Sequence, residues 1–301
     1  MNVKLTHFLT TDKLRLPGLL YEPTSSTTKA AIYLHGCGSS SVFYKPVMNV
    51  WGKQFTDQGI AFFPFNNRGA HLIKSLHQET EEEETERVVG GTYYEKIVEC
   101  VFDIDGAVNI LKDKGYETFY LIGHSTGANK IVVYNELTKQ NPFSNYILLA
   151  GGDDTGLNYE MLGKKRFNAA LSRAKQEINL GKEMKTVPKY LYPEPYTYRA
   201  LYDVLNPDGE YNTFPFYEFL NNKKLSTKAL FRMYRNIEKN MLVIYGEQDE
   251  FCFNNVLGCM NALMKHTNPK SHAEFRIIPD TGHGFEDKEE DLGYMMSKWI
   301  A

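Results

Sequence analysis

LIGHSTGANK, residues 121–130, places a serine between two glycines, and the interpretation of the whole chain depends on it. The apolar run FYLI leads into this segment, and the helix-permissive run ANKIVVYNEL follows the serine. This order predicts a buried strand, a sharp turn at Ser125 and then a helix. Gly123 and Gly127 are the small neighbours that such a crowded turn requires, as in a G-x-S-x-G nucleophile elbow. The alternative is an ordinary turn in which the Ser125 hydroxyl only caps the helix.

The composition is that of an ordinary soluble domain. The 301 residues are 42% hydrophobic and 24% charged, with a net charge of −3, so nucleic acid and membrane surfaces are not expected as partners. The N-terminus lacks the pattern of a signal peptide, and no stretch approaches the roughly 18 apolar residues of a membrane span. The cysteines show no metal-like spacing, and we therefore expect a cytoplasmic protein with reduced thiols at Cys37, Cys100, Cys252 and Cys259.

Short apolar runs alternate with longer amphipathic stretches along most of the chain. VKLTHFL and LRLPGLLYEP predict an antiparallel pair. Six later runs are almost continuously apolar, which is typical of strands buried on both faces of a parallel sheet: residues 30–36, 60–66, 119–125, 146–152, 241–249 and 274–283. Helical patterns separate them at residues 42–58, 95–114, 128–139, 253–266 and 286–300. The alternation predicts an α/β fold with a mostly parallel, eight-stranded, doubly wound sheet.

Two insertions interrupt this alternation. Residues 153–240 contain no convincing strand, and we expect a cap of helices and turns there, with residues 1–152 and 241–301 forming the core domain. Residues 70–92 contain the run QETEEEETE, whose density of glutamate predicts an exposed, mobile segment.

A serine nucleophile needs a base and a carboxylate that orients the base. His283 follows the last predicted strand between two glycines and is the expected base, whereas His124 is the main rival inside the turn itself. Asp249 follows the strand before it and is the preferred acid. Asp153 and Asp154 end an earlier strand, and either remains an alternative.

Two further carboxylates and one thiol complete the set of alternatives. Glu247 and Glu250 flank the preferred acid and are expected in solvent beside the site. The backbone amides of Thr126 and Cys37 are the expected oxyanion donors, with Gly38 as a neighbour that binds substrate. Cys37 as the nucleophile is the less favoured reading, since no histidine is placed for it.

With these residues in place, the chain resembles the α/β-hydrolase superfamily over nearly its whole length. The motifs are HG at 35–36, GHSTG at 123–127, YGEQD at 245–249 and GHGF at 282–285. The resemblance implies an α/β-hydrolase fold and a serine hydrolase. In addition, NNRG at 66–69, the segment 91–107 and GHSTGANK are similar to a branch that includes fungal siderophore-ester hydrolases.

The expected cap is rich in aromatic and basic residues. Its rings suit an apolar or aromatic substrate group, with Tyr196 and Phe216 as candidate contacts, or else pack the cap onto the sheet. Its basic residues suggest an anionic group or a solvated helix face. No metal or cofactor is expected. We therefore expect hydrolysis of a carboxylic ester; the alternatives are an amidase or peptidase with the same residues, or a non-catalytic ligand-binding protein.

Overall fold

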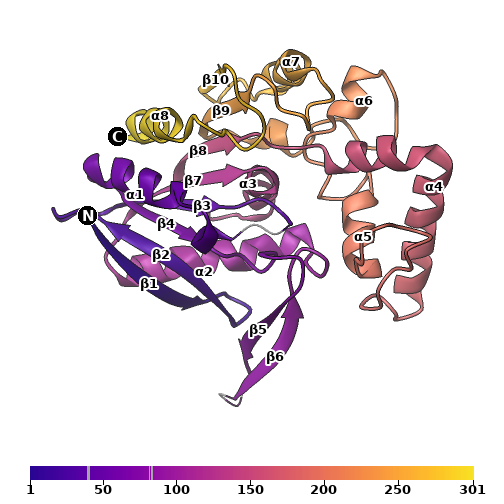
Figure 1. Cartoon of the computed structure of the whole chain (residues 1–301), viewed down its shortest axis with the longest axis horizontal. Coiled ribbons are helices and arrows are strands. Elements are labelled where there is room, and N and C mark those ends of the chain that lie inside the picture. Colours follow the sequence, from indigo (N-terminus) through magenta and orange to yellow (C-terminus); the bar gives the residue numbers. More distant parts are fainter. Residues whose placement is uncertain (39–40, 81, 83) are drawn as a thin grey trace.

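The fold is described by a computed structural model of residues 1–38, 41–80, 82 and 84–301. Within these residues a ten-stranded sheet has the order β10-β9-β8-β7-β3-β4-β2-β5-β6, and β1 pairs with β2. The strands are β1 (Asn2–Leu9), β2 (Leu14–Glu22), β3 (Lys29–Leu34), β4 (Ala61–Phe65), β5 (Lys74–Glu79), β6 (Thr85–Gly90), β7 (Thr118–His124), β8 (Phe143–Leu149), β9 (Asn240–Gly246) and β10 (Ala273–Ile278). Figure 1 shows the sheet with helices around it.

The predicted fold class is confirmed. All six continuous apolar runs form parallel strands, and β1 and β2 form the expected antiparallel pair. Helices occupy the predicted intervals: α1 (Val47–Asp57), α2 (Cys100–Asp113), α3 (Thr126–Leu137), α7 (Val256–His266) and α8 (Glu289–Ile300), with short 3-10 turns η1 (Val42–Tyr44) and η2 (Ile97–Glu99). The central strands are buried on both faces because helices pack against each side of the sheet.

The segment 70–92 differs from the prediction. It forms the hairpin β5–β6, which adds two strands to the expected eight and projects from the sheet at the bottom of Figure 1. Both faces of this hairpin are mostly exposed, with Leu76 and Gly90 as its buried residues. Residues 74–90 therefore lack the alternation of apolar and polar residues that would have predicted two strands with one buried face. Glu81 and Glu83 of the glutamate run lie outside the described residues.

The segment between β8 and β9 consists of helices, turns and irregular chain. It contains α4 (Asp154–Asn179), α5 (Tyr198–Leu205), α6 (Phe216–Leu220) and η3 (Tyr234–Asn236). α4 bends at Gly163, whose φ of 69° is open to glycine. α4 and α5 share a small apolar core of their own, and Figure 1 shows them beyond the end of the sheet toward which β7 and β8 point.

The strand register brings the carboxyl ends of the six parallel strands to one edge. Leu34 of β3 pairs with Gly123 of β7, and His124 pairs with Leu149 of β8. Tight turns and polar side chains follow these strands. The candidate site therefore lies at the carboxyl edge of the sheet.

Candidate active site

Ser125 occupies the sharp turn that the sequence predicts. Its φ of 57° and ψ of −129° are a strained combination for a residue with a side chain, and its amide donates to Leu149 O at 2.8 Å. A Cβ on Gly123 would lie 2.3 Å from Gly127 O, and a Cβ on Gly127 would lie 2.2 Å from Leu34 O. Only glycine fits at both positions, so the turn is held between two strands and the start of α3.

His283 and Asp249 are paired at the same edge. The Nδ1 atom of His283 lies 3.1 Å from each carboxylate oxygen of Asp249, which is 2% exposed. Because a carboxylate only accepts, Nδ1–H is the donor to Asp249, and in the tautomer with this single proton Nε2 is an acceptor, which is the form that a general base needs. The Phe251 ring packs edge-on against His283 at 4.6 Å, and Glu250 accepts the His283 amide.

His124, the rival base, supports His283 instead. Burial lowers the pKa of His124 to about 3, so its ring is neutral. Its Nε2–H donates to His283 O at 2.8 Å, and the two rings lie 5.0 Å apart. The residue before Ser125 thereby fixes the loop that presents His283. The sequence showed only a histidine in a turn, and nothing in it indicated this hydrogen bond.

The two aspartates after β8 have separate surroundings. Asp153 is 3% exposed, and its two oxygens accept the amides of Gly156 and Tyr217, so it caps α4. Asp154 is only partly buried, and burial raises the pKa of its carboxyl to about 6. Neither hydrogen-bonds to His283 in the described structure. The pairing thus favours Asp249 over both alternatives as the residue that orients His283.

The loop after β3 passes directly over the turn. A Cβ on Gly36 would come within 2.8 Å of Ser125 Cβ, so the backbone approaches the serine as closely as glycine allows. The Thr126 side chain lies close enough to the Cys37 thiol to influence its pKa, so the two residues predicted to supply oxyanion donors are neighbours. Burial raises the pKa of the Cys37 thiol to about 11, which disfavours a thiolate nucleophile at neutral pH.

Two residues hold this loop from beneath. The Gly38 amide donates to Thr92 Oγ1 at 2.8 Å, and the Thr92 hydroxyl donates to Gly69 O at 2.9 Å. His35 is buried and neutral, and its Nε2 accepts the Asn67 amide at 3.1 Å. The Gly38 amide already donates to Thr92, so it cannot also donate to a substrate, and the role of Gly38 is to shape the loop. In the sequence Thr92 stands in the segment 91–107, and no local pattern there marks it as a support of this loop.

The two candidate substrate contacts in the cap are placed differently. The Phe216 ring is fully buried, stacks on Phe214 at 5.9 Å and meets Tyr245 of β9, so it packs the cap onto the sheet. Tyr196 is partly exposed, and its ring lies 4.6 Å from Tyr93. The pKa of its hydroxyl is raised, first by burial and then by Cys37. Tyr196 therefore lies near the candidate site, whereas Phe216 belongs to the core.

Comparison with known proteins places the chain in a family. A family described as "Protein of unknown function (DUF1749)" matches residues 96–300, which is more than half of the chain and includes Ser125, Asp249 and His283. The chain belongs to the DUF1749 family. Among curated proteins, no sequence matches this DUF1749 member.

Solved structures with similar folds cover nearly the whole of this DUF1749 chain. The α/β-hydrolase GrgF from Penicillium sp. sh18 has a TM-score of 0.65 at 15% identity, covering 98% of this chain and 97% of its own. Est1E from Butyrivibrio proteoclasticus, solved with ferulic acid, has a TM-score of 0.63 at 13% identity, covering 98% of each chain. A thermostable carboxyl esterase from Bacillus coagulans has a TM-score of 0.60 at 14% identity, covering 100% and 98%. At these identities the likeness shows the α/β-hydrolase fold.

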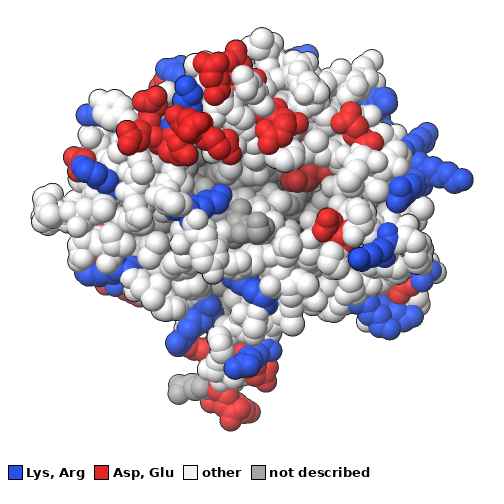
Figure 2. Space-filling model, in the orientation of Figure 1, with Lys and Arg blue, Asp and Glu red and all other residues white. Residues whose placement is uncertain are grey.

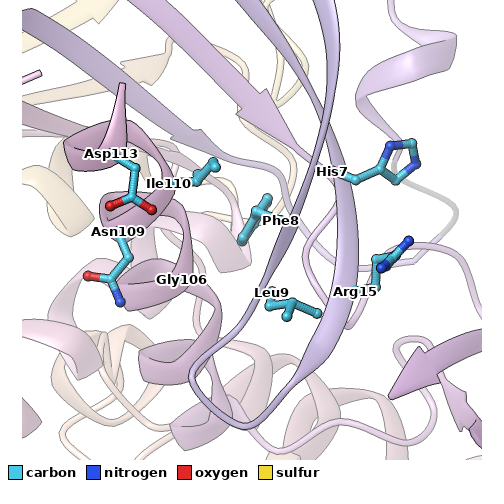
Figure 3. Close-up of a pocket in the computed structure, with 8 residues that line it drawn as sticks. All are labelled: His7, Phe8, Leu9, Arg15, Gly106, Asn109, Ile110 and Asp113. Carbon is cyan, nitrogen blue, oxygen red and sulfur yellow. The ribbon is translucent and has the colours of Figure 1, made fainter. Parts of the chain in front are cut away.

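Other features of the described residues lie outside this site. A pocket of about 430 Å³ lies between the β1–β2 hairpin and α2, where Phe8 and Ile110 lie between the two elements and Asn109 and Asp113 extend from α2 (Figure 3). Across the described ranges, no three His, Cys, Asp or Glu side chains are grouped as metal ligands. No helix in the part of the chain described here is both long and apolar enough to cross a bilayer.

Proposed function

We propose that this protein is a serine hydrolase that cleaves carboxylic esters through an acyl-enzyme. The observation that carries the proposal is the hydrogen-bonded Asp249–His283 pair at the sheet edge where Ser125 occupies a strained turn. The esterases among the structural neighbours support it as an analogy of fold. We also propose that the protein acts in the cytoplasm, because its four cysteines are expected to be reduced thiols.

In the proposed reaction, Ser125 Oγ attacks the ester carbonyl while His283 Nε2 takes the hydroxyl proton. Asp249 holds Nδ1–H and stabilises the imidazolium that forms. His283 then returns the proton to the leaving alcohol, and a water molecule activated by the same ring releases the acid from Ser125. The closeness of His124 keeps the ring in place through the His283 carbonyl.

The negative oxygen of the tetrahedral intermediate needs fixed donors. Thr126 begins α3, where backbone amides have no partner within the helix. The Cys37 amide lies in the loop over Ser125, beside the Thr126 side chain. These two amides are the proposed donors, and the support given by Thr92 and His35 fixes the second of them.

The segment 153–240 is proposed as the cap that sets substrate range. It leaves the sheet at the end of β8, next to Ser125, and it brings Tyr196 toward the loop that contains Cys37. Hydrogen bonds from Thr197 and Arg199 to the carbonyls of Tyr93 and Tyr94 attach it to the segment that follows the hairpin. Figure 2 shows a hollow near the centre of this face, between the sheet and α4 and α5.

A panel of p-nitrophenyl esters tests the proposal. We expect the wild-type protein to cleave acetyl, butyryl or benzoyl esters in preference to the matched anilides. Ser125→Ala should lose several powers of ten in kcat/KM while keeping its circular dichroism spectrum. Ser271→Ala, a serine outside the site, is the matched control and should retain activity. Near-wild-type hydrolysis by Ser125→Ala would overturn the assignment.

A further inference from the structure

A second cavity lies behind the loop that presents His283. It has a volume of about 340 Å³, and its walls come from β3, β7, α1 with the turn before it, and the chain that follows β10. None of Ser125, Asp249 and His283 lines it. The size lies in the range of pockets that bind small molecules, and a cavity of roughly 150 Å³ already holds benzene.

One face of the sheet forms the floor of this cavity. Tyr33 of β3 pairs with Ile122 of β7, and side chains two residues apart on a strand share a face, so Tyr33 and His124 lie on the same face. α1 and α8 lie side by side at the left of Figure 1, and Trp51 of α1 donates to Glu289 O of α8 at 2.8 Å. Since all four of the side chains other than Ile122 line the cavity, it is enclosed between the sheet and these two helices.

Aromatic rings form much of the cavity wall. The Trp51 ring meets the Tyr33 ring at 5.5 Å and 74°, and the Phe285 ring lies 5.9 Å from the His124 ring. Tyr44 also lines the cavity and is 76% exposed, so the cavity meets solvent beside this ring. A wall of this kind suits a flat ligand ring, which can make offset and edge-to-face contacts with it.

Two polar atoms of this wall lack a protein partner. Tyr33 is only 1% exposed, yet its hydroxyl makes no hydrogen bond within the described residues. His124 donates from Nε2 to His283 O, since a carbonyl only accepts, and Nδ1 of the neutral ring is left as an acceptor. Neither atom is among the polar atoms that are closed off from solvent without a partner, so both are open to the cavity. Buried polar atoms are normally hydrogen-bonded, and a ligand hydroxyl would supply the missing bonds.

The charged groups around the cavity are of both signs. Lys45 lines it, is half-buried and forms no ion pair in the part of the chain described here, while Glu286 and Glu289 line it as well. A charged ligand would be attracted by one sign and repelled by the other, and it would also lose its hydration on entry. A neutral ring with one hydroxyl avoids both costs. Such a hydroxyl donates and accepts, which matches the acceptor on His124 and the hydroxyl of Tyr33.

We propose that this cavity is a second ligand site, which binds a small neutral phenol and is separate from the ester site at Ser125. The binding does not depend on the proposed ester hydrolysis, whereas its consequence for turnover rests on that function. The consequence passes through His124, whose ring lines the cavity and holds the His283 carbonyl at 2.8 Å. A bound phenol therefore acts on the loop of the base without taking the place of the ester.

Titration of the wild-type protein with five small ligands, followed by NMR, tests the binding and its chemistry. The ligands are phenol, toluene, cyclohexanol, benzoate and benzylammonium. We expect phenol to bind most tightly, because toluene lacks the hydroxyl, cyclohexanol lacks the flat ring and the last two carry a charge. Equal binding of phenol and toluene, or tighter binding of benzoate or benzylammonium, would overturn the proposal.

Two substitutions locate the ligand. Tyr33→Phe removes only the hydroxyl and should weaken phenol binding about 3- to 10-fold, the contribution of one hydrogen bond, while toluene binding stays the same. Tyr120→Phe is the matched control, because Tyr120 is a buried tyrosine of β7 that does not line the cavity. Val47→Phe adds a ring to the cavity wall at the start of α1 and should abolish binding, with circular dichroism to verify the fold. Undiminished phenol binding in Tyr33→Phe, or in folded Val47→Phe, would overturn the proposal.

Two further measurements separate this site from the ester site. In protein with ¹⁵N-labelled histidines, phenol should shift the ring signals of His124, and an unmoved His124 would contradict the proposal. A donor on Nδ1 strengthens the Nε2–H bond to the His283 loop, so kcat on a responsive ester should rise, by less than about 2-fold, at unchanged KM. A rise in KM instead would overturn the proposal, since the cavity would then belong to the ester site. Phenol binding with these properties but without cleavage of any ester would support the site and contradict the proposed function alone.

Discussion

Replacing Thr92 with valine removes one hydroxyl that hydrogen-bonds to the loop after β3 and keeps the shape of the side chain. In the structure that hydroxyl accepts from the Gly38 amide at 2.8 Å and donates to Gly69 O at 2.9 Å, and Thr92 is 6% exposed. Both backbone groups lose their partner in Thr92→Val. We expect the free energy of unfolding to fall by about 1–3 kcal/mol, because buried backbone groups are left without a hydrogen-bond partner.

The same substitution should affect turnover through the neighbouring Cys37 amide. Loss of one oxyanion donor costs about 10²–10³ in kcat. In Thr92→Val the donor is displaced and not removed, so we expect a smaller loss of about 10- to 100-fold. KM should change little, because the loop acts on the transition state more than on the bound ester.

Steady-state kinetics on one responsive ester, combined with urea unfolding, measures both effects. Thr92→Ser keeps the hydroxyl and is the matched control, for which kcat should stay near the wild-type value. A lower stability of Thr92→Val with unchanged kcat would refute the reasoning, since the loop would then keep its shape without the hydroxyl. A rise in KM alone would equally count against a role in the transition state.

Four further changes test other parts of the site and the cap. Asp249→Asn should lower kcat by up to about 10⁴-fold, since the charge that stabilises the imidazolium is lost, whereas Asp153→Asn should mainly lower the melting temperature. His124→Phe should lower kcat about 10-fold by freeing the His283 loop, and His124→Gln, which can still donate, should lower it less; equal losses would contradict the hydrogen bond. Phe216→Ala should destabilise the fold by about 3–5 kcal/mol in urea unfolding without changing the ratio of rates on large and small esters. Burial raises the pKa of Asp203 to about 7, so between about pH 4 and 7 the folded state holds a proton that the unfolded state has lost. The contribution of Asp203 to the free energy of unfolding should fall by about 4 kcal/mol as pH rises through this range, and Asp203→Asn should make the measured slope less steep.

The sheet and its turn were predictable because their physical demands are local. Strands buried on both faces need continuous apolar runs, and the turn at Ser125 needs small neighbours at Gly123 and Gly127. The pairing of Asp249 with His283 followed from chain order, since both come after strands that end at one edge. The hairpin at 74–90 was missed because neither of its faces is buried enough to impose an alternating pattern.

The roles of single side chains in the cap could not be predicted in the same way. Tyr196 and Phe216 are both aromatic residues between prolines and turns, and only packing separates the one near the site from the one in the core. Asp153 and Asp154 are adjacent and chemically identical. Their different surroundings depend on the amides of Gly156 and Tyr217, and Tyr217 lies far along the chain. Such long-range partners leave no local signal in the sequence.

Covalent labelling of the intact protein by a fluorophosphonate, followed by peptide mass spectrometry, tests the central claim most directly. The proposed chemistry predicts one adduct per chain, on Ser125, formed far more slowly in His283→Ala and absent in Ser125→Ala. A protein that stays unlabelled while it is folded, or that carries the adduct on Cys37 or another residue, would contradict the assignment of Ser125 as the nucleophile.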